Sequence, residues 1–301
     1  MENLAAGAVA FEFQRDGFRA NSFWLREIED LNFPAGDETD FSRESLEKFL
    51  PEKTNFFVRG LNLQKSSDDF QRAVARGNSA TKILLLARAR AILHEFFAGE
   101  ISLENDIFPL FADEFSFGAT RAGELFAILR TADEVFATQK REKLIAGFEK
   151  FLKTSAGEIV EFTADGRVFR EVFPRENLFS KKESTIGGAI LVELSAGDET
   201  FAIGQKGAIL IAATDGEPVR EILKNLAEDL PERNLPKLVE FFSLPTFDRF
   251  DEIASIEKSF WNNLPAGFQF FTPFAPESLS VKSVRGAQNL RVDFYARYLK
   301  N

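Results

Sequence analysis

The stretch AILVELSAGDETFAIGQKGAILIA, residues 189–212, contains three short apolar segments separated by turns that carry glycine. The apolar segments are residues 189–194, 200–203 and 208–212. Their content of Ile, Leu, Val and Phe is typical of β-strands, and the glycines between them permit tight turns. Because links this short join only antiparallel neighbours, we expect an antiparallel sheet here.

The rest of the second half indicates further hairpins and helices. Residues 158–162 and 167–173 alternate on either side of an Asp165-Gly166 turn, which predicts a hairpin. A closing hairpin is expected with strands at 279–284 and 290–298. Helices are predicted at residues 219–230, 237–244 and 247–264.

The first half begins with a hairpin and then favours helices. Residues 8–13 alternate in polarity and size, Asp16-Gly17 supplies a turn, and an apolar segment follows at 23–25. A strand is predicted at 55–63. Helices are predicted at residues 45–50, 66–77, 79–98, 120–130 and 132–153, the last opened by a capping box from Thr131 to Glu134.

The pattern changes near residues 154–157, where helical spacing gives way to alternation. We therefore predict a mainly helical domain with an N-terminal β-hairpin at 1–156, and an α+β domain with an antiparallel sheet at 157–301. The predicted fold class is α+β, with a mainly helical N-terminal half and an antiparallel sheet plus helices in the C-terminal half.

Composition excludes several kinds of chemistry. The 301 residues include 35 Phe but only two Tyr, two Trp and one Met, which suits a Phe-rich core. Because Cys is absent, disulfide bonds, thiol catalysis and cysteine metal sites are excluded. His94 is the single imidazole, and its apolar neighbours favour a half-buried structural role. We predict no catalytic, cofactor-binding or metal-binding residue.

Charge gives a weak indication of a phosphate contact. The formal net charge of −10 argues against a surface built wholly for nucleic acid. Residues 71–93 nevertheless carry bases and no acid, so Arg72, Arg76 and Lys82 could contact phosphate or nucleic acid. Residues 95–118 carry acids and no base, and internal pairing of the two tracts is the interpretation we favour.

No segment resembles a membrane span. The most apolar stretch, residues 83–97, is interrupted by charges and falls short of the roughly 20 apolar residues that cross a bilayer. Residues 1–25 carry five charges and no apolar core typical of a secretory signal. We expect a soluble, cytoplasmic, acidic protein without membrane contact.

A Pro-interrupted segment near the C-terminus is the strongest candidate for a partner surface. Residues 268–276 carry four Phe side chains and cannot form a regular helix, because Pro273 and Pro276 interrupt them. If exposed, the rings would bind a protein partner; if buried, they would fill the core. The four rings are Phe268, Phe270, Phe271 and Phe274.

These observations favour a non-enzymatic intracellular adaptor or assembly protein that acts through protein–protein contacts, including self-association. Two alternatives stay open: a metal-dependent phosphoester hydrolase or nuclease built from carboxylates, and a nucleic-acid-binding subunit of a complex. Distant carboxylates can assemble an active site without leaving a local motif, so the sequence does not decide among the three.

Overall fold

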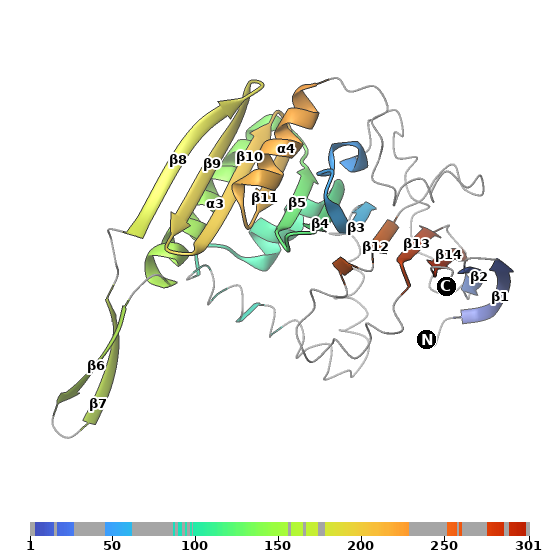
Figure 1. The fold of residues 1–301 in the computed structure, drawn as a ribbon, viewed down its shortest axis with the longest axis horizontal. Helices are drawn as coiled ribbons and strands as arrows, with labels where there is room; N and C mark the ends of the chain where they lie inside the picture. Colours follow the sequence, from blue (N-terminus) through green and yellow to red (C-terminus); the bar gives the residue numbers. More distant parts are fainter. Residues whose placement is uncertain are drawn as a thin grey trace. The chain divides into compact units, whose positions relative to one another are not determined.

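The computed structural model describes most of the chain, and the statements below concern these residues. They are 4–14, 17–26, 46–61, 99–155, 158–164, 167–173, 178–228, 252–257, 276–285 and 289–298, with residues 87, 90, 91, 94, 97, 259 and 260. The chain divides into two compact units (Figure 1). The first is Met1–Leu61, Ser116–Glu124 and Leu230–Asn301, and the second is Asn62–Phe115 and Leu125–Asp229.

Antiparallel strands dominate the described residues, so the predicted fold class with a mainly helical N-terminal half is wrong. Twelve strands are hydrogen-bonded in an order that begins at β1 and ends at β8. The pairs with defined register are all antiparallel. The α-helices whose bounds lie within the described residues are α3 (Glu134–Ser155) and α4 (Gly216–Ala227).

The first unit contains strands from both ends of the chain. In hydrogen-bonded order they are β1 (Leu4–Gln14), β2 (Gly17–Arg26), β14 (Asn289–Arg297), β13 (Ser278–Arg285), β12 (Glu252–Glu257), β3 (Thr54–Leu61) and most of β4 (Glu114–Thr120). Both predicted hairpins, β1–β2 and β13–β14, are confirmed, and β2 pairs with β14. A 3-10 turn, η2 (Leu46–Phe49), precedes β3.

The predicted helix at 247–264 is wrong over residues 252–257. These residues form β12, whose backbone pairs with β13 on one side and β3 on the other. Two neighbouring strands satisfy both edges of the β12 backbone, and this tertiary pairing outweighs the local preference for a helix.

The second unit contains a run of five strands. In order they are β5 (Leu125–Arg130), β11 (Ile209–Ala213), β10 (Glu199–Lys206), β9 (Ala189–Ala196) and β8 (Phe179–Ile186). The three predicted strands of the 189–212 stretch are confirmed as β9, β10 and β11. The predicted helix at 120–130 is wrong, because a turn with Gly123 at φ +91° ends β4 and the chain continues as β5.

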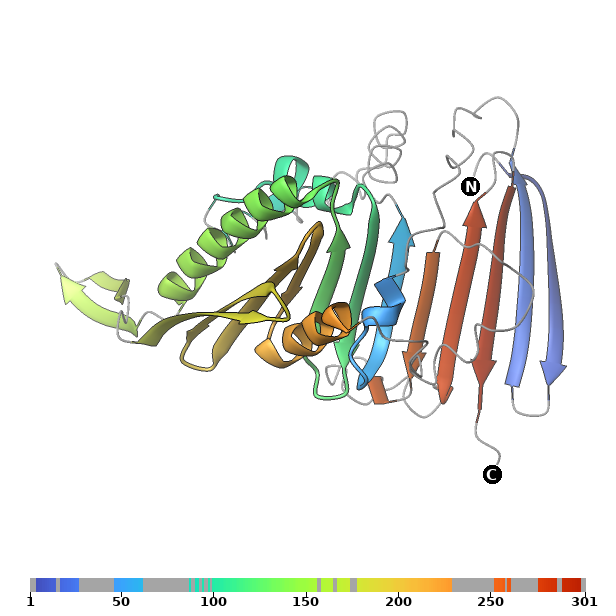
Figure 2. The same cartoon turned by 90° about the horizontal axis from the view of Figure 1, so that it is seen from above.

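Helices α3 and α4 pack on opposite faces of this run of strands (Figure 2). Successive residues of a strand point to opposite faces, and β10 shows the consequence at two neighbouring positions. Gly204 faces α4, where Val219 and Leu223 lie against it. Gln205 faces α3 and hydrogen-bonds to Thr138 and Arg141.

Helix α4 is anchored by a cap and an apolar stripe. The Asp215 carboxylate accepts a hydrogen bond of 2.8 Å from the backbone N–H of Glu217, which satisfies one donor of the first turn. Val219, Ile222 and Leu223 recur at helical spacing and are fully buried. The helix predicted at 219–230 is therefore confirmed, with its start and its end each three residues earlier than predicted.

Helix α3 confirms the helix predicted at 132–153, but its cap differs from the predicted capping box. Asp133, not Thr131, accepts the hydrogen bond from the backbone N–H of Phe136, at 2.7 Å. The Thr131 hydroxyl instead lies 2.8 Å from the carbonyl oxygen of Ala208. Farther along α3, the rings of Phe148 and Phe201 of β10 stack at 4.3 Å.

A separate two-stranded sheet lies between α3 and β8 in the sequence. It consists of β6 (Glu158–Ala164) and β7 (Arg167–Phe173), as the Asp165-Gly166 turn predicts. The predicted domain boundary between residues 156 and 157 stays a prediction. In the part of the chain that the structure describes, no helix is long and apolar enough to cross a membrane.

The close approach of α4 to β10 gives a testable prediction. A Cβ atom on Gly204 would lie 2.6 Å from Cγ1 of Val219, well inside contact distance. We expect Gly204→Ala to lower the free energy of unfolding by about 1–3 kcal/mol, measured by urea denaturation. Val219→Ala in the same chain removes the obstructing methyl groups, so the double variant should lose less stability than the sum of the two single variants. Strict additivity would contradict this packing.

Candidate functional site

An exposed apolar row on β1 is the clearest candidate for a binding surface. Val9, Phe11 and Phe13 point to one face because side chains two residues apart share a face of a strand. Their exposed fractions are 48%, 62% and 82%. Every residue from 7 to 13 is exposed. Single exposed apolar residues are ordinary, but a row of three on one strand indicates an interaction surface.

The neighbouring strand β2 covers this row only slightly. Two of the three facing residues on β2 are small, so they leave the Val9 and Phe11 side chains accessible. The register pairs Val9 with Ser22, Phe11 with Ala20 and Phe13 with Phe18.

The backbone of β1 adds hydrogen-bonding groups, N–H and C=O, beside the same apolar row. β1 begins the strand order, and among the described residues its strand neighbour is β2 alone. The N–H and C=O groups of alternate residues on an edge strand point away from the sheet and can pair with an added strand. The site therefore combines a hydrogen-bonding edge with an apolar face.

The edge strand β8 at the other end of the order has the opposite character. It carries three consecutive charged residues, Lys181, Lys182 and Glu183, all exposed. Charges of this kind protect an edge against pairing with another chain. β1 carries one charged residue, Glu12, and no proline over its 11 residues. β1 thus lacks the protection that β8 has.

The β6–β7 hairpin presents a second, smaller apolar surface. The rings of Phe162 and Phe169 stack with centroids 5.6 Å apart and are 42% and 44% exposed. A two-stranded hairpin alone is marginally stable in water, so packing against something else would stabilise it. Nothing in its geometry identifies what that would be.

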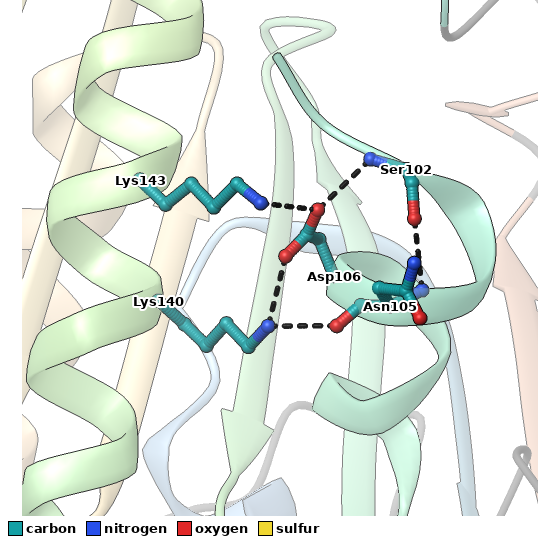
Figure 3. Close-up of polar contacts among 5 residues, drawn as sticks. All are labelled: Ser102, Asn105, Asp106, Lys140 and Lys143. Carbon is teal, nitrogen blue, oxygen red and sulfur yellow. Dashed lines mark hydrogen bonds and ion pairs between the residues drawn. The ribbon is translucent and has the colours of Figure 1, made fainter. Parts of the chain in front are cut away.

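The strongest polar cluster surrounds Asp106, which is buried (Figure 3). Its Oδ1 lies 2.9 Å from Nζ of Lys140, and its Oδ2 lies 2.7 Å from Nζ of Lys143. The backbone N–H of Ser102 also donates to Oδ2, at 2.9 Å. Lys140 donates a further hydrogen bond to the carbonyl oxygen of Asn105. Both carboxylate oxygens therefore have cationic partners.

The pKa of Asp106 follows from these contacts. Burial alone would raise the pKa, because a buried carboxylate loses hydration. Hydrogen bonds from Lys143, from the backbone of Ser102 and from Lys140 oppose burial, and the charge of Lys140 adds to them. The result is a pKa lowered from 3.8 to about 2. Asp106 is therefore ionised at neutral pH.

This cluster fixes local structure. A carboxylate with so low a pKa is a poor general base, and its oxygens already accept three hydrogen bonds. Asp106 lies on the short π-helix η3 (Leu103–Ile107), whereas Lys140 and Lys143 lie on α3. The three side chains hold η3 against α3.

Two predictions about the basic tract can be examined. His94 is exposed, so the predicted half-buried role is wrong; the helix carrying it turns that side chain outward. Arg90 pairs with Glu104 at 2.5 Å, which agrees with internal pairing of the basic and acidic tracts. Arg72, Arg76 and Lys82 lie outside the described residues, and their phosphate contact stays a prediction.

The aromatic segment predicted to bind a partner also lies outside the described residues. Its members are Phe268, Phe270, Phe271 and Phe274. The sequence predicts the β1–β2 hairpin but not the exposure of the β1 row. The available signal was the near absence of charge from residues 4–14, which is unusual for an exposed edge strand.

Comparison with known proteins adds no family to this description. No protein-family model, curated protein or solved structure matches the chain. Over the described residues, no group of three or more His, Asp or Glu side chains is arranged to hold a metal ion.

Replacing Asp106 tests the structural role of its cluster. Asp106→Asn removes the charge that balances Lys140 and Lys143, and we expect a loss of about 2 kcal/mol in the free energy of unfolding near pH 7, measured in urea. Glu104→Gln is a matched control on the same short helix, because its exposed ion pair contributes about 1 kcal/mol or less. Equal losses in the two variants would contradict the assigned role.

The same cluster predicts a pH dependence. Because folding lowers the pKa of Asp106 from 3.8 to about 2, its contribution is present above pH 4 and lost as the pH falls towards 2. The stability difference between wild type and Asp106→Asn should therefore shrink by about 2 kcal/mol across that range. Unfolding curves at several pH values measure it, and a difference independent of pH would refute the assignment.

Proposed function

We propose that this chain is a non-enzymatic assembly or adaptor protein that binds a protein partner by strand addition at β1. The observation that carries the proposal is the exposed row of Val9, Phe11 and Phe13 on a strand that begins the sheet order. A partner strand would pair with the outer edge of β1 and bring its own side chains beside the apolar row.

Strand addition assigns separate roles to backbone and side chains. Hydrogen bonds between the backbones supply affinity without regard to sequence, and the alternating side chains select the partner. On β1, selection would come from the odd-numbered row, which requires an apolar partner surface. Burying an exposed Phe or Val side chain completely contributes about 1.5–3 kcal/mol, part of which offsets the entropy lost on association.

The other polar features of the described residues support structure. Asp106 is held by two lysines, and Gln205 and Arg141 bind each other between β10 and α3. Neither arrangement directs a reactive group outward. The carboxylate hydrolase and the nucleic-acid-binding subunit stay alternatives that no described contact favours. We keep a cytoplasmic location as part of the proposal, supported by a sequence without cysteine.

A charge placed in the apolar row tests the proposal. Phe11→Lys replaces an aromatic ring with a cation at a position that is 62% exposed, so the fold should tolerate it, while an apolar side chain of a partner strand beside it would lose its contact. We expect wild-type bait to retain one stoichiometric protein from native lysate and the Phe11→Lys bait to lose it. The measurement is affinity capture with identification of the retained protein by mass spectrometry.

The matched control is Val135→Lys, which places the same charge at an exposed apolar position on α3. This variant should retain the partner as wild type does, and circular dichroism should show all three proteins folded. Retention of the same partner by Phe11→Lys, or loss from both variants, would refute a binding role for β1.

A further inference from the structure

We infer that the strand added to β1 is β1 of a second copy of this chain, paired antiparallel about a twofold axis perpendicular to the sheet. The inference depends on the proposed function and names its partner. Three properties of the β1–β2 ribbon support it. They are its low net charge, the position of its apolar residues at odd numbers, and the distribution of large and small residues along the strand.

Charge makes this ribbon the favourable place for two copies to meet. The chain has a net charge of −10, so two copies repel each other over most approaches. The charged residues of β1 and β2 are Glu12, Arg19 and Arg26, which sum to +1. Arg19, which lies opposite Glu12 in the register, pairs with Asp293 of β14 at 3.3 Å, and with this acid included the four charges sum to zero. Copies that approach through this ribbon therefore avoid the repulsion between acidic surfaces.

Symmetry then places the two apolar rows on the same side. A twofold axis perpendicular to a sheet leaves each face of the sheet on its own side. Because residues directly opposite each other on two strands point to the same face, an odd-numbered residue of one copy then pairs with an odd-numbered residue of the other. The odd-numbered Val9, Phe11 and Phe13 of one copy therefore lie beside the odd-numbered row of the other. Parallel pairing in register would instead place Glu12 against Glu12, which is unfavourable.

If the twofold axis passes at Ala10, each residue of the exposed segment 7–13 pairs with a residue of the same segment in the other copy. Gly7 then faces Phe13, and Val9 faces Phe11, so large side chains lie across from smaller ones. An aromatic ring opposite a glycine on a neighbouring strand compensates for the missing side chain. Glu12 faces Ala8 and remains near its own Arg19. The segment can therefore pair with an antiparallel copy of itself.

The absence of cysteine permits a clean geometric test. At a twofold axis a residue faces its own copy with Cα atoms about 4.5–5.5 Å apart, within the range of about 4.4–6.8 Å that a disulfide bond spans. We would place a single cysteine in turn at Ala8, Val9, Ala10 and Phe11, and at Glu183 on the charged edge strand β8 as a control. Each variant is oxidised mildly, and the linked dimer is measured by non-reducing electrophoresis.

We expect the yield of linked dimer to peak at Ala10→Cys, about tenfold or more above Glu183→Cys, because a specific pair holds the two thiols together. A peak at another β1 position also supports a second copy and moves the axis. Yields no higher than that of the β8 control at every β1 position would overturn the inference.

Sedimentation of proteins without an introduced cysteine, over a dilution series, measures the monomer–dimer equilibrium directly. Wild type and Val135→Lys should change from monomer to dimer as concentration rises, whereas Phe11→Lys should remain a monomer. The substitution removes the ring that would pack beside Val9 of the other copy and places two ammonium groups diagonally across the paired strands. A wild type that stays monomeric overturns self-pairing. If a different protein is captured by wild type and lost from Phe11→Lys, the proposed function still holds, so the two failures are distinguishable.

Discussion

Alternation along β10 controls how the second unit packs. Gly204 and Gln205 are neighbours in sequence but face α4 and α3, respectively. The missing side chain of Gly204 lets Val219 approach the strand, while the amide of Gln205 binds Thr138 and Arg141 of the opposite helix. The sheet can therefore carry a helix on each face only while this order of residues is kept.

The second helix layer depends on a further contact. The Phe148 ring of helix α3 stacks on Phe201 of β10 and also meets the ring of Phe97 edge to face, with centroids 5.1 Å apart. A Cβ atom on Gly147 would lie 2.7 Å from Ile101, so small size is required at this position too. Asp106 then fixes the end of the segment that follows Phe97 with two ion pairs. Apolar contacts at one end and charges at the other hold the segment on α3.

The fold was predictable where local signals and tertiary pairing agree. The β1–β2, β6–β7 and β13–β14 hairpins carry alternation next to turn residues, and α3 and α4 carry helical spacing with caps. The predictions failed at 120–130 and 252–257, where the segments are so short that their apolar residues fit both helical spacing and strand alternation. Strands β5 and β12 form there because neighbouring strands satisfy their backbones, and a single sequence does not contain that information.

The candidate site was not predictable for a related reason. Residues 8–13 show which strand forms, but only the strand order shows that β1 lies at an edge. Without that order, Phe11 and Phe13 are indistinguishable from the many Phe side chains assigned to the core. The predicted Phe segment at 268–274 rested on local composition as well. Exposure depends on the neighbours of a segment, which lie far away in sequence.

The exposure of Phe11 separates its role from the stability of the fold. A residue that is 62% exposed contributes little to the core, and threonine would serve an edge strand as well while improving solubility. β8 shows that this chain can protect an edge with charges, since Lys181, Lys182 and Glu183 stand there in succession. Val9 and Phe11, at 48% and 62% exposure, therefore add little to the core. A second strand paired beside β1 would give both side chains a packing partner.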